Sequence, residues 1–266
     1  MKKISSLQNP RFKSALKLHT SRGRNQQNQF IVFGLRECRR AIEAGVIPLS
    51  VFACTELLAP VANDWLQTSV PSENCFEITS EMSAKLEFGN RTDGLAIVAE
   101  RPNVNLESLN VGKTYLVVVL EAIEKPGNLG AILRSCDGAG VDAVVTANPL
   151  TDFFHPNCIR ASMGAVFSMN LGSGDSTTVK SFLNQAGFES HVAIVEATQT
   201  VHQADFTSPR CALVFGNEAR GLSDTWQALQ TNGIRIPMRG IGDSLNVSVS
   251  AGIVAYEAVR QRIEMA

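Results

Sequence analysis

Short apolar runs alternate with polar stretches along the first hundred residues. Their spacing predicts strands at residues 30–33, 49–53, 75–78 and 94–99, and helices at 11–18, 35–44, 61–66 and 81–86. Mixed elements this short indicate a small α/β domain. Residues 101–113 (RPNVNLESLNVGK) are polar and carry Pro102 and Gly112, as is typical of a linker. We therefore divide the chain into a domain at 1–103, a linker at 104–113 and a second domain at 114–266.

The pattern after the linker is stronger. Residues 115–120 form a continuous valine-rich apolar run, as expected of a strand buried on both faces. Further apolar runs predict strands at 144–145, 192–195 and 212–215. Helical spacing at 129–136 should end at Gly138 or Gly140, and residues 172–174 (GSG) should form the turn that opens a helix at 176–185. Alternating strands and helices predict an α/β fold with a mostly parallel sheet.

Ligands of a parallel sheet bind in the loops that follow the carboxyl ends of its strands. Three loops of the second domain meet that condition, at residues 121–128, 216–223 and 237–244. We therefore expect the functional site where these three loops meet.

Composition restricts the class of protein. The chain has 266 residues, 44% hydrophobic and 18% charged, enough for a packed core in one large or two smaller domains. No apolar run approaches the length of a membrane span, and the polar N-terminus is unlike a secretory signal. The six cysteines have neither metal-ligand nor disulfide spacing. We expect a cytoplasmic protein with reduced thiols, no metal and no membrane association.

Charge is unevenly distributed along the chain. Residues 1–40 hold ten basic residues and one acid, a net charge of +9, which leaves −10 for the remainder. A basic block on an acidic body is compatible with a polyanion partner and equally with a solvated surface arm.

The first candidate segment runs from Asn128 to Arg134 (NLGAILR). Asn128 stands where a helix N-cap is expected, and Gly130 permits close approach in the first turn. Arg134 follows less than two turns later. Alone, this segment is best interpreted as a capped amphipathic helix with one solvent-facing arginine.

Two further segments carry polar side chains next to glycines. Residues 213–223 (LVFGNEARGLS) form either a strand-to-helix turn or a ligand loop containing Glu218. In residues 236–250 (IPMRGIGDSLNVSVS), small polar residues alternate with apolar ones from Ser244 to Ser250. This alternation fits an amphipathic edge strand, and its density of hydrogen-bonding groups favours a polar lining before the final apolar helix.

Together, the three segments resemble the three motifs of the SpoU (TrmH-type) branch of the SPOUT methyltransferases. Those motifs are Asn-x-Gly-x-x-x-Arg, Gly-x-Glu with a following Gly-Leu/Met, and Ile-Pro-Met…Ser-Leu-Asn-Val-Ser-Val-Ala. All three occur in this order across residues 116–262. Ala219 and Ser250 depart from the common glycine and alanine, and both are small changes.

The resemblance implies an enzyme that transfers a methyl group from S-adenosylmethionine to a ribose 2′-hydroxyl of RNA. It implies a parallel α/β catalytic domain whose C-terminal segment forms a trefoil knot. The cofactor would lie among Gly216, Ile236 and Leu245, with the two apolar side chains against the adenine. The matching catalytic residues are Arg134, Asn128, Glu218, Ser244 and Asn246.

The resemblance also suggests a role for each catalytic residue. A guanidinium is a poor base, so Arg134 would stabilise developing alkoxide and hold a neighbouring phosphate. Asn128 would orient the ribose or Arg134, and Glu218 would bind Arg134 or the substrate. Ser244 and Asn246 would fix the loop and the reacting groups.

The N-terminal segment resembles the substrate-binding domain of the family's ribosomal RNA enzymes. The match rests on Ile4-Ser5-Ser6, Asn9-Pro10, Lys13 and a Phe-x-x-x-Gly-x-Arg stretch formed by Phe30, Gly34 and Arg36. Phe33 stands where the family often has an acid. The resemblance implies an RNA-binding domain and, as substrate, ribosomal RNA.

Family members pair their knotted domains, which implies a homodimer. A final helix expected at about 252–263 aligns Gly252, Tyr256, Val259 and Ile263 in an apolar stripe, with Ile253 alongside. This stripe suits either a dimer interface or packing on its own sheet.

Three alternatives stay open. One is a transfer RNA 2′-O-methyltransferase, and another is a catalytically inactive RNA-binding or ribosome-assembly factor. A nucleotide-dependent oxidoreductase is weakened by the missing dinucleotide fingerprint.

Overall fold

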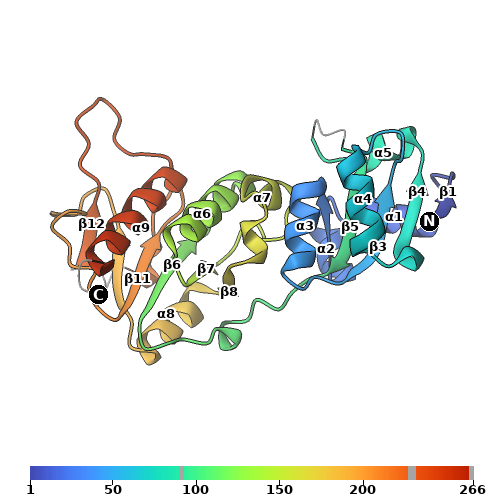
Figure 1. The fold of residues 1–266 in the computed structure, drawn as a ribbon. Coiled ribbons are helices and arrows are strands. Elements are labelled where there is room, and N and C mark those ends of the chain that lie inside the picture. The colour runs from blue at the N-terminus through green and yellow to red at the C-terminus, as the bar shows by residue number, and fades with distance from the viewer. Residues whose placement is uncertain (90–92, 227–231, 264–266) are drawn as a thin grey trace. The chain divides into compact units, whose positions relative to one another are not determined.

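The computed structural model describes residues 1–89, 93–226 and 232–263, and the chain divides into two compact units (Figure 1). Unit 1 comprises Met1–Pro102 and Asp152–Ser168, and unit 2 comprises Asn103–Thr151 and Met169–Ala266. These units differ from the predicted domains in two places. The segment predicted as a linker belongs to unit 2, where Leu106 and Leu109 are buried. Residues 152–168, which were assigned to the second domain, belong to unit 1.

Unit 1 is built on a five-stranded sheet in the order β1-β4-β3-β5-β2. Its strands are β1 (Lys2–Ile4), β2 (Gln29–Phe33), β3 (Pro48–Ala53), β4 (Cys75–Ile78) and β5 (Leu95–Glu100). Its helices are α1 (Pro10–Lys17), α2 (Ser21–Gln27), α3 (Leu35–Glu43), α4 (Pro60–Ser69), η1 (Ser72–Asn74), α5 (Ser80–Leu86), α7 (Pro156–Ala161) and η3 (Ala165–Phe167). All eight elements predicted in this region are present. Sequence reasoning missed β1, which has three residues, and α2, which has no apolar residue.

The core of unit 1 joins the N-terminal helices to the sheet. Phe12 and Leu18 are fully buried and pack with Phe52 of β3. Arg24 of α2 is only 1% exposed, and its Nη2 donates a hydrogen bond of 2.6 Å to Oδ2 of Asp152. Arg24 therefore stabilises the fold of unit 1 and is removed from the solvent-exposed charge of the basic block.

Unit 2 contains a seven-stranded sheet in the order β10-β12-β9-β11-β6-β7-β8. Its strands are β6 (Tyr115–Glu121), β7 (Ala143–Ala147), β8 (Asn170–Gly174), β9 (Glu189–Ala193), β10 (Gln199–Thr200), β11 (Arg210–Phe215) and β12 (Gly233–Arg235). Every neighbouring pair in this sheet is parallel. The predicted parallel α/β fold is therefore confirmed.

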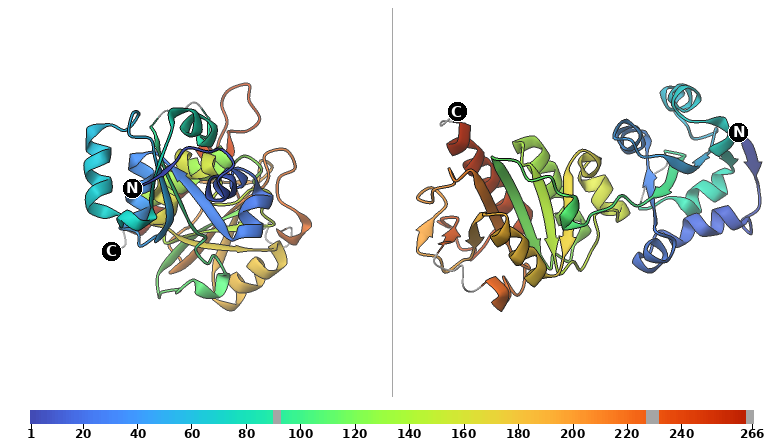
Figure 2. Two further views of the ribbon diagram at one scale, coloured as in Figure 1. Left: turned by 90° about the vertical axis from the view of Figure 1, so that its right-hand side faces the viewer. Right: turned by 90° about the horizontal axis from the view of Figure 1, so that it is seen from below.

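Helices cover both faces of this sheet (Figure 2). They are η2 (Leu106–Ser108), α6 (Pro126–Ala139), α8 (Ser176–Gln185) and α9 (Val247–Ile263). Helices α6 and α9 pack against each other on one face. On the other face, Val117 and Val119 of β6 share a core with Val179 and Leu183 of α8. No described helix is long and apolar enough to cross a membrane.

Two local predictions in unit 2 were wrong, and one open alternative is excluded. Lys125 occupies the N-cap position of helix α6 without a side-chain capping bond, and the helix begins at Pro126, which has no amide N–H to satisfy. Asn128 therefore lies inside the first turn. Residues 172–174 belong to β8, where Gly172 leaves room for Leu106 and Leu109. Of the two interpretations left open for the polar alternation up to Ser250, the edge strand is excluded, because α9 already begins at Val247.

Two other expectations hold. Gly140 ends α6 in a left-handed conformation with φ of 74°. All six cysteines are free and buried. Burial raises the pKa of the Cys136 and Cys211 thiols to about 12, so neither is a reactive thiolate near neutral pH.

Candidate active site

Four adjacent strands of unit 2 end at one edge of the sheet. These are β12, β9, β11 and β6, and the loop after each runs into a common groove. The groove, here called the loop groove, has a volume of about 1040 Å³. It is lined by residues 192–198, 215–223 and 244–247 together with Lys125, Asn128, Trp226 and Ser250. Sequence reasoning missed the contribution of the loop after β9.

One hydrogen-bonded chain joins the three predicted motifs. Asn128 Nδ2 donates to Glu218 Oε1 at 2.5 Å, and Asn246 Nδ2 donates to Asn128 Oδ1 at 3.3 Å. Asn246 Oδ1 in turn accepts from the backbone amide of Ser248 at 2.9 Å, in the first turn of α9. The amide of Asn128 is therefore fixed in one orientation, and Glu218 is bound by Asn128 where the sequence suggested Arg134 or the substrate.

The loop that carries Glu218 is closed by its own backbone. Asn217 and Gly221 exchange two main-chain hydrogen bonds, of 3.0 Å and 2.9 Å. A methyl group on Gly216 would lie 2.3 Å from the carbonyl carbon of Gly221, so only glycine fits there. Gly216 is thus required by the loop's own closure, beyond any approach to a cofactor.

A buried carboxylate anchors the far end of the same loop. Glu121, at the end of β6, is 2% exposed and accepts hydrogen bonds from the backbone amide and hydroxyl of Ser223 at 2.7 Å and 2.6 Å. Ser176 donates a third at 2.5 Å. Burial by itself would raise the pKa of Glu121, but these hydrogen bonds outweigh it and lower that pKa below its ordinary value.

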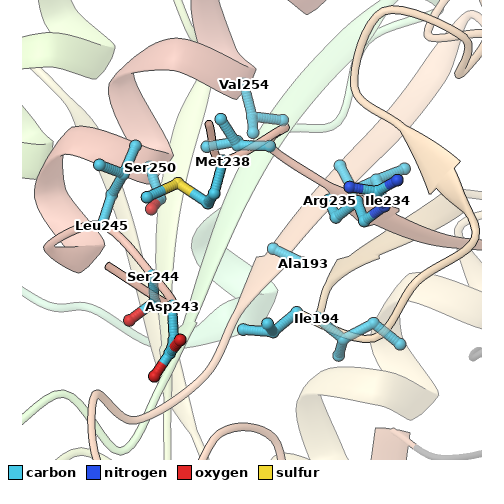
Figure 3. A pocket seen from close by; sticks show the side chains of 12 residues that line it. Ala193, Ile194, Ile234, Arg235, Met238, Asp243, Ser244, Leu245, Ser250 and Val254 are labelled. Atoms are coloured by element: carbon cyan, nitrogen blue, oxygen red, sulfur yellow. The ribbon is translucent and has the colours of Figure 1, made fainter. Parts of the chain in front are cut away.

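An apolar pocket of about 200 Å³ adjoins the loop groove (Figure 3). The apolar pocket is lined by residues 193–195, 234–236 and 243–245 together with Met238, Ser250 and Val254. Ala193, Ile194, Ser244, Leu245 and Ser250 also line the loop groove, so the two cavities are continuous.

The apolar pocket suits the adenine of S-adenosylmethionine in its chemistry. Ile194, Ile236 and Leu245 offer apolar surface for the base, and the continuous loop groove leaves room for the rest of the cofactor. The carboxylate of Asp243 adds one acceptor near the rim. No group of three or more potential metal ligands occurs among the described residues.

The predicted site residues separate into two groups. Asn128, Gly216, Glu218, Ser244, Leu245 and Asn246 line the loop groove, and Ile236 lines the apolar pocket. Arg134 lines neither cavity. It is exposed on α6 and makes no hydrogen bond or ion pair within the described residues.

Comparison with known proteins identifies what this arrangement belongs to. Residues 115–256 match the SpoU rRNA Methylase family, and residues 9–96 match the MRM3-like substrate binding domain. The chain is 30% identical to a 23S rRNA (uridine(2479)-2′-O)-methyltransferase of Streptomyces viridochromogenes, over 90% of this chain and 85% of that protein.

Solved structures agree over nearly the whole chain. A crystal structure of an RNA 2′-O ribose methyltransferase superposes with a TM-score of 0.85 at 33% identity, covering 98% of this chain and 99% of the other. The SpoU methyltransferase AviRb from Streptomyces viridochromogenes, in complex with AdoMet, superposes with a TM-score of 0.87 at 27% identity, covering 96% and 99%.

A parallel sheet with this site at its carboxyl edge, and matches of this extent, define an RNA 2′-O-ribose methyltransferase that uses S-adenosylmethionine. The chain belongs to the SpoU rRNA methylase family.

Proposed function

We propose that this chain methylates a ribose 2′-hydroxyl of ribosomal RNA, and of 23S rRNA in particular. The observation that carries the proposal is the hydrogen-bonded chain Asn246–Asn128–Glu218, which unites three motifs beside the apolar pocket. The 23S rRNA specificity of the Streptomyces relative and the match to a substrate-binding domain support ribosomal over transfer RNA. The same site favours an enzyme over an inactive assembly factor.

The reaction forms a bond between the ribose oxygen and the methyl carbon while the sulfur–methyl bond breaks. Bound S-adenosylmethionine supplies the electrophilic methyl group. Glu218 and Asn128 hold the ribose in line, where alignment supplies much of the rate increase. Arg134 stabilises the developing alkoxide and binds the adjacent phosphate, and the hydroxyl proton leaves to that phosphate or to solvent.

We propose that Arg134 acts in the site of a partner subunit within a homodimer. Six residues of helix place Arg134 about 9 Å along α6 from Asn128 and about 120° around it, so the two side chains diverge. Arg134 lies one turn before Gly138, where a methyl group would be 3.1 Å from the Tyr256 hydroxyl of α9.

The exposed face of α9 supports this dimer. Val249, Ile253 and Tyr256 are 48%, 37% and 53% exposed, whereas Val254, Ala255 and Ala258 are buried. A second copy covering this apolar face would meet α6 near Arg134. We further propose that the C-terminal segment forms a trefoil knot and that the enzyme works in the cytoplasm, where its six free cysteines stay reduced.

The test is methyl transfer from radiolabelled S-adenosylmethionine to transcribed 23S rRNA, followed by mapping of the 2′-O-methyl group. The expected result is one modified ribose in 23S rRNA and none in bulk transfer RNA. Modification of transfer RNA alone would replace the proposed substrate. Tight RNA binding without transfer to either RNA would identify the assembly factor.

A further inference from the structure

Asn217 lies between the two motif residues Gly216 and Glu218, and both its amide oxygen and its amide nitrogen make hydrogen bonds. It is 7% exposed. Its Oδ1 accepts from the backbone amides of Ala219 at 2.9 Å and Arg220 at 3.0 Å. Its Nδ2 donates to the carbonyl of Ala122 at 2.9 Å and to Glu124 Oε1 at 3.1 Å.

The two halves of this amide serve different ends. Acceptance by Oδ1 from the next residues is the usual way in which asparagine stabilises a turn, and it would suffice for the loop alone. Donation by Nδ2 reaches a second loop more than 90 residues earlier in the chain. A turn needs no such donation, so the hydrogen bonds from Nδ2 serve a purpose other than stabilising the turn.

Donation by the Asn217 amide fixes the distance between the loop after β6 and the loop after β11. The acceptors Ala122 and Glu124 lie in the loop between β6 and α6, and the first turn of α6 carries Asn128. Asn128 is the hydrogen-bond donor to Glu218, the neighbour of Asn217. Loss of the amide donor would release the Glu218 loop from the loop that holds its partner.

We propose that Asn217 is a positioning residue for methyl transfer, which acts through its donor group to hold Glu218 against Asn128. The inference rests on the proposed function, because Glu218 and Asn128 are there the groups that align the ribose. In this proposal Asn217 acts through Glu218 and Asn128, because its own amide is bonded to protein groups. The Asn217 Nδ2 group, which donates to Ala122 and Glu124, therefore affects kcat. Other groups determine the affinity for RNA.

The experiment compares Asn217→Asp, Glu124→Gln and the double variant, with Asn170→Asp as matched control. The change Asn217→Asp keeps the acceptor half of the side chain but sets a carboxylate against Glu124. In the double variant, the amide introduced at position 124 can donate to the new carboxylate at position 217, which restores the link with reversed polarity. Asn170 also donates its amide to a carbonyl, that of Asp142 at 2.9 Å, at the far edge of the sheet.

Asn217→Asp is expected to lower kcat by about 10- to 100-fold with KM for RNA changed less than about twofold. The double variant should regain at least about threefold of that loss, and the control should match wild type. The pH profile adds a second signature. The defect of Asn217→Asp should shrink as pH falls, because the introduced carboxyl group can donate a hydrogen bond once it is protonated.

Three results overturn the inference. One is an Asn217→Asp enzyme with wild-type kcat, and another is a double variant no more active than the single. The third is a fall in melting temperature of both Asn217 variants that accounts for their lost activity, which would leave Asn217 a folding role only. Wild-type enzyme inactive on all RNAs is the separate outcome that refutes the proposed function, and the inference falls with it.

Discussion

Asn128 donates a hydrogen bond of 2.5 Å to Glu218 across 90 residues of sequence. This single contact joins the first turn of α6 to the loop after β11, and it turns two separate motifs into one site. The orientation of the Asn128 amide is fixed as well, because its nitrogen donates to Glu218 while its oxygen accepts a hydrogen bond from Asn246.

We predict that Asn128→Ala and Glu218→Ala each lower kcat by about 10- to 100-fold, since a hydrogen bond to a charged group contributes about 1.5–3 kcal/mol. The double variant should lose little more than either single variant. A double-mutant cycle on single-turnover rates measures this coupling. Additive losses would mean that the two residues act independently.

A second prediction concerns Arg134, which lines neither cavity of its own chain. Arg134→Ala should lower kcat by at least about 100-fold while S-adenosylmethionine still binds. If Arg134 serves the partner's site, a mixture of Arg134→Ala and Asn128→Ala chains forms one intact site in each mixed dimer. Subunit exchange at equal concentrations should then restore about a quarter of wild-type activity.

The control for this exchange is Arg134→Ala mixed with the double variant Arg134→Ala/Asn128→Ala, which offers no intact site in either arrangement. If the first mixture stays inactive after its chains have exchanged, Arg134 acts in the site of its own subunit. An active full-length monomer in sedimentation equilibrium would refute the dimer.

Much of this site could be predicted from sequence because polar motif residues follow apolar strands. The loops after β6 and β11 were expected for that reason, and both line the groove. Glu121 and Asn217 were missed. Glu121 ends an apolar strand, and its bond to Ser223 crosses 102 residues, so nothing local marks it. Asn217 looks like an ordinary turn residue until its partners Ala122 and Glu124 are known.

Much of the fold could also be predicted from sequence, and the predictions that failed did so for related reasons. The apolar pattern correctly predicted β6 and α8. Gly172 and Gly174 of β8 are typical of a turn, and this strand was therefore missed. Residues 152–168 lie between two strands of unit 2, and only long-range contacts reveal their place in unit 1. Phe154 and Phe167, for example, pack against Phe30, with ring centroids 5.0 Å and 5.9 Å away.

A third prediction follows from the buried ion pair of unit 1. Asp152→Ala leaves the Arg24 guanidinium buried without its carboxylate and should lower the free energy of unfolding by about 3–5 kcal/mol. Urea denaturation followed by circular dichroism measures the loss. The exposed pair of Lys85 and Glu81 is the control, and Glu81→Ala should cost less than about 1 kcal/mol. Equal losses would refute a structural role for Arg24.

The structural role of residues 1–24 determines how RNA binding by the basic block should be tested. Deletion of residues 1–24 would remove Phe12 and Leu18 from the core, so it would unfold unit 1 and say nothing of charge. Four basic residues of this block are also paired within unit 1, namely Lys3, Arg24, Arg36 and Arg39.

The fourth prediction therefore uses exposed charges. Lys13, Lys17 and Arg22 lie on the surface of α1 and α2. If each contacts one phosphate, their triple replacement by alanine should reduce the slope of log affinity against log salt by about 2 to 3. Filter binding to 23S rRNA fragments between 50 and 200 mM salt, about the range in which such slopes are resolved, measures the change. Lys113→Ala is the control in unit 2, and an unchanged slope would exclude α1 and α2 from the RNA interface.

The last prediction concerns Glu121, whose pKa is lowered in the folded chain by Ser176 and Ser223 despite its burial. A carboxyl with a lowered folded pKa stabilises the fold above its unfolded pKa, and that stabilisation is lost as pH falls through the folded pKa. Glu121→Gln should thus cost about 2–3 kcal/mol at neutral pH and progressively less in acid, because charge no longer strengthens the three hydrogen bonds. Melting curves of both proteins from neutral to acidic pH should converge. A constant difference would mean that the charge of Glu121 contributes nothing, and that only its shape holds the loop.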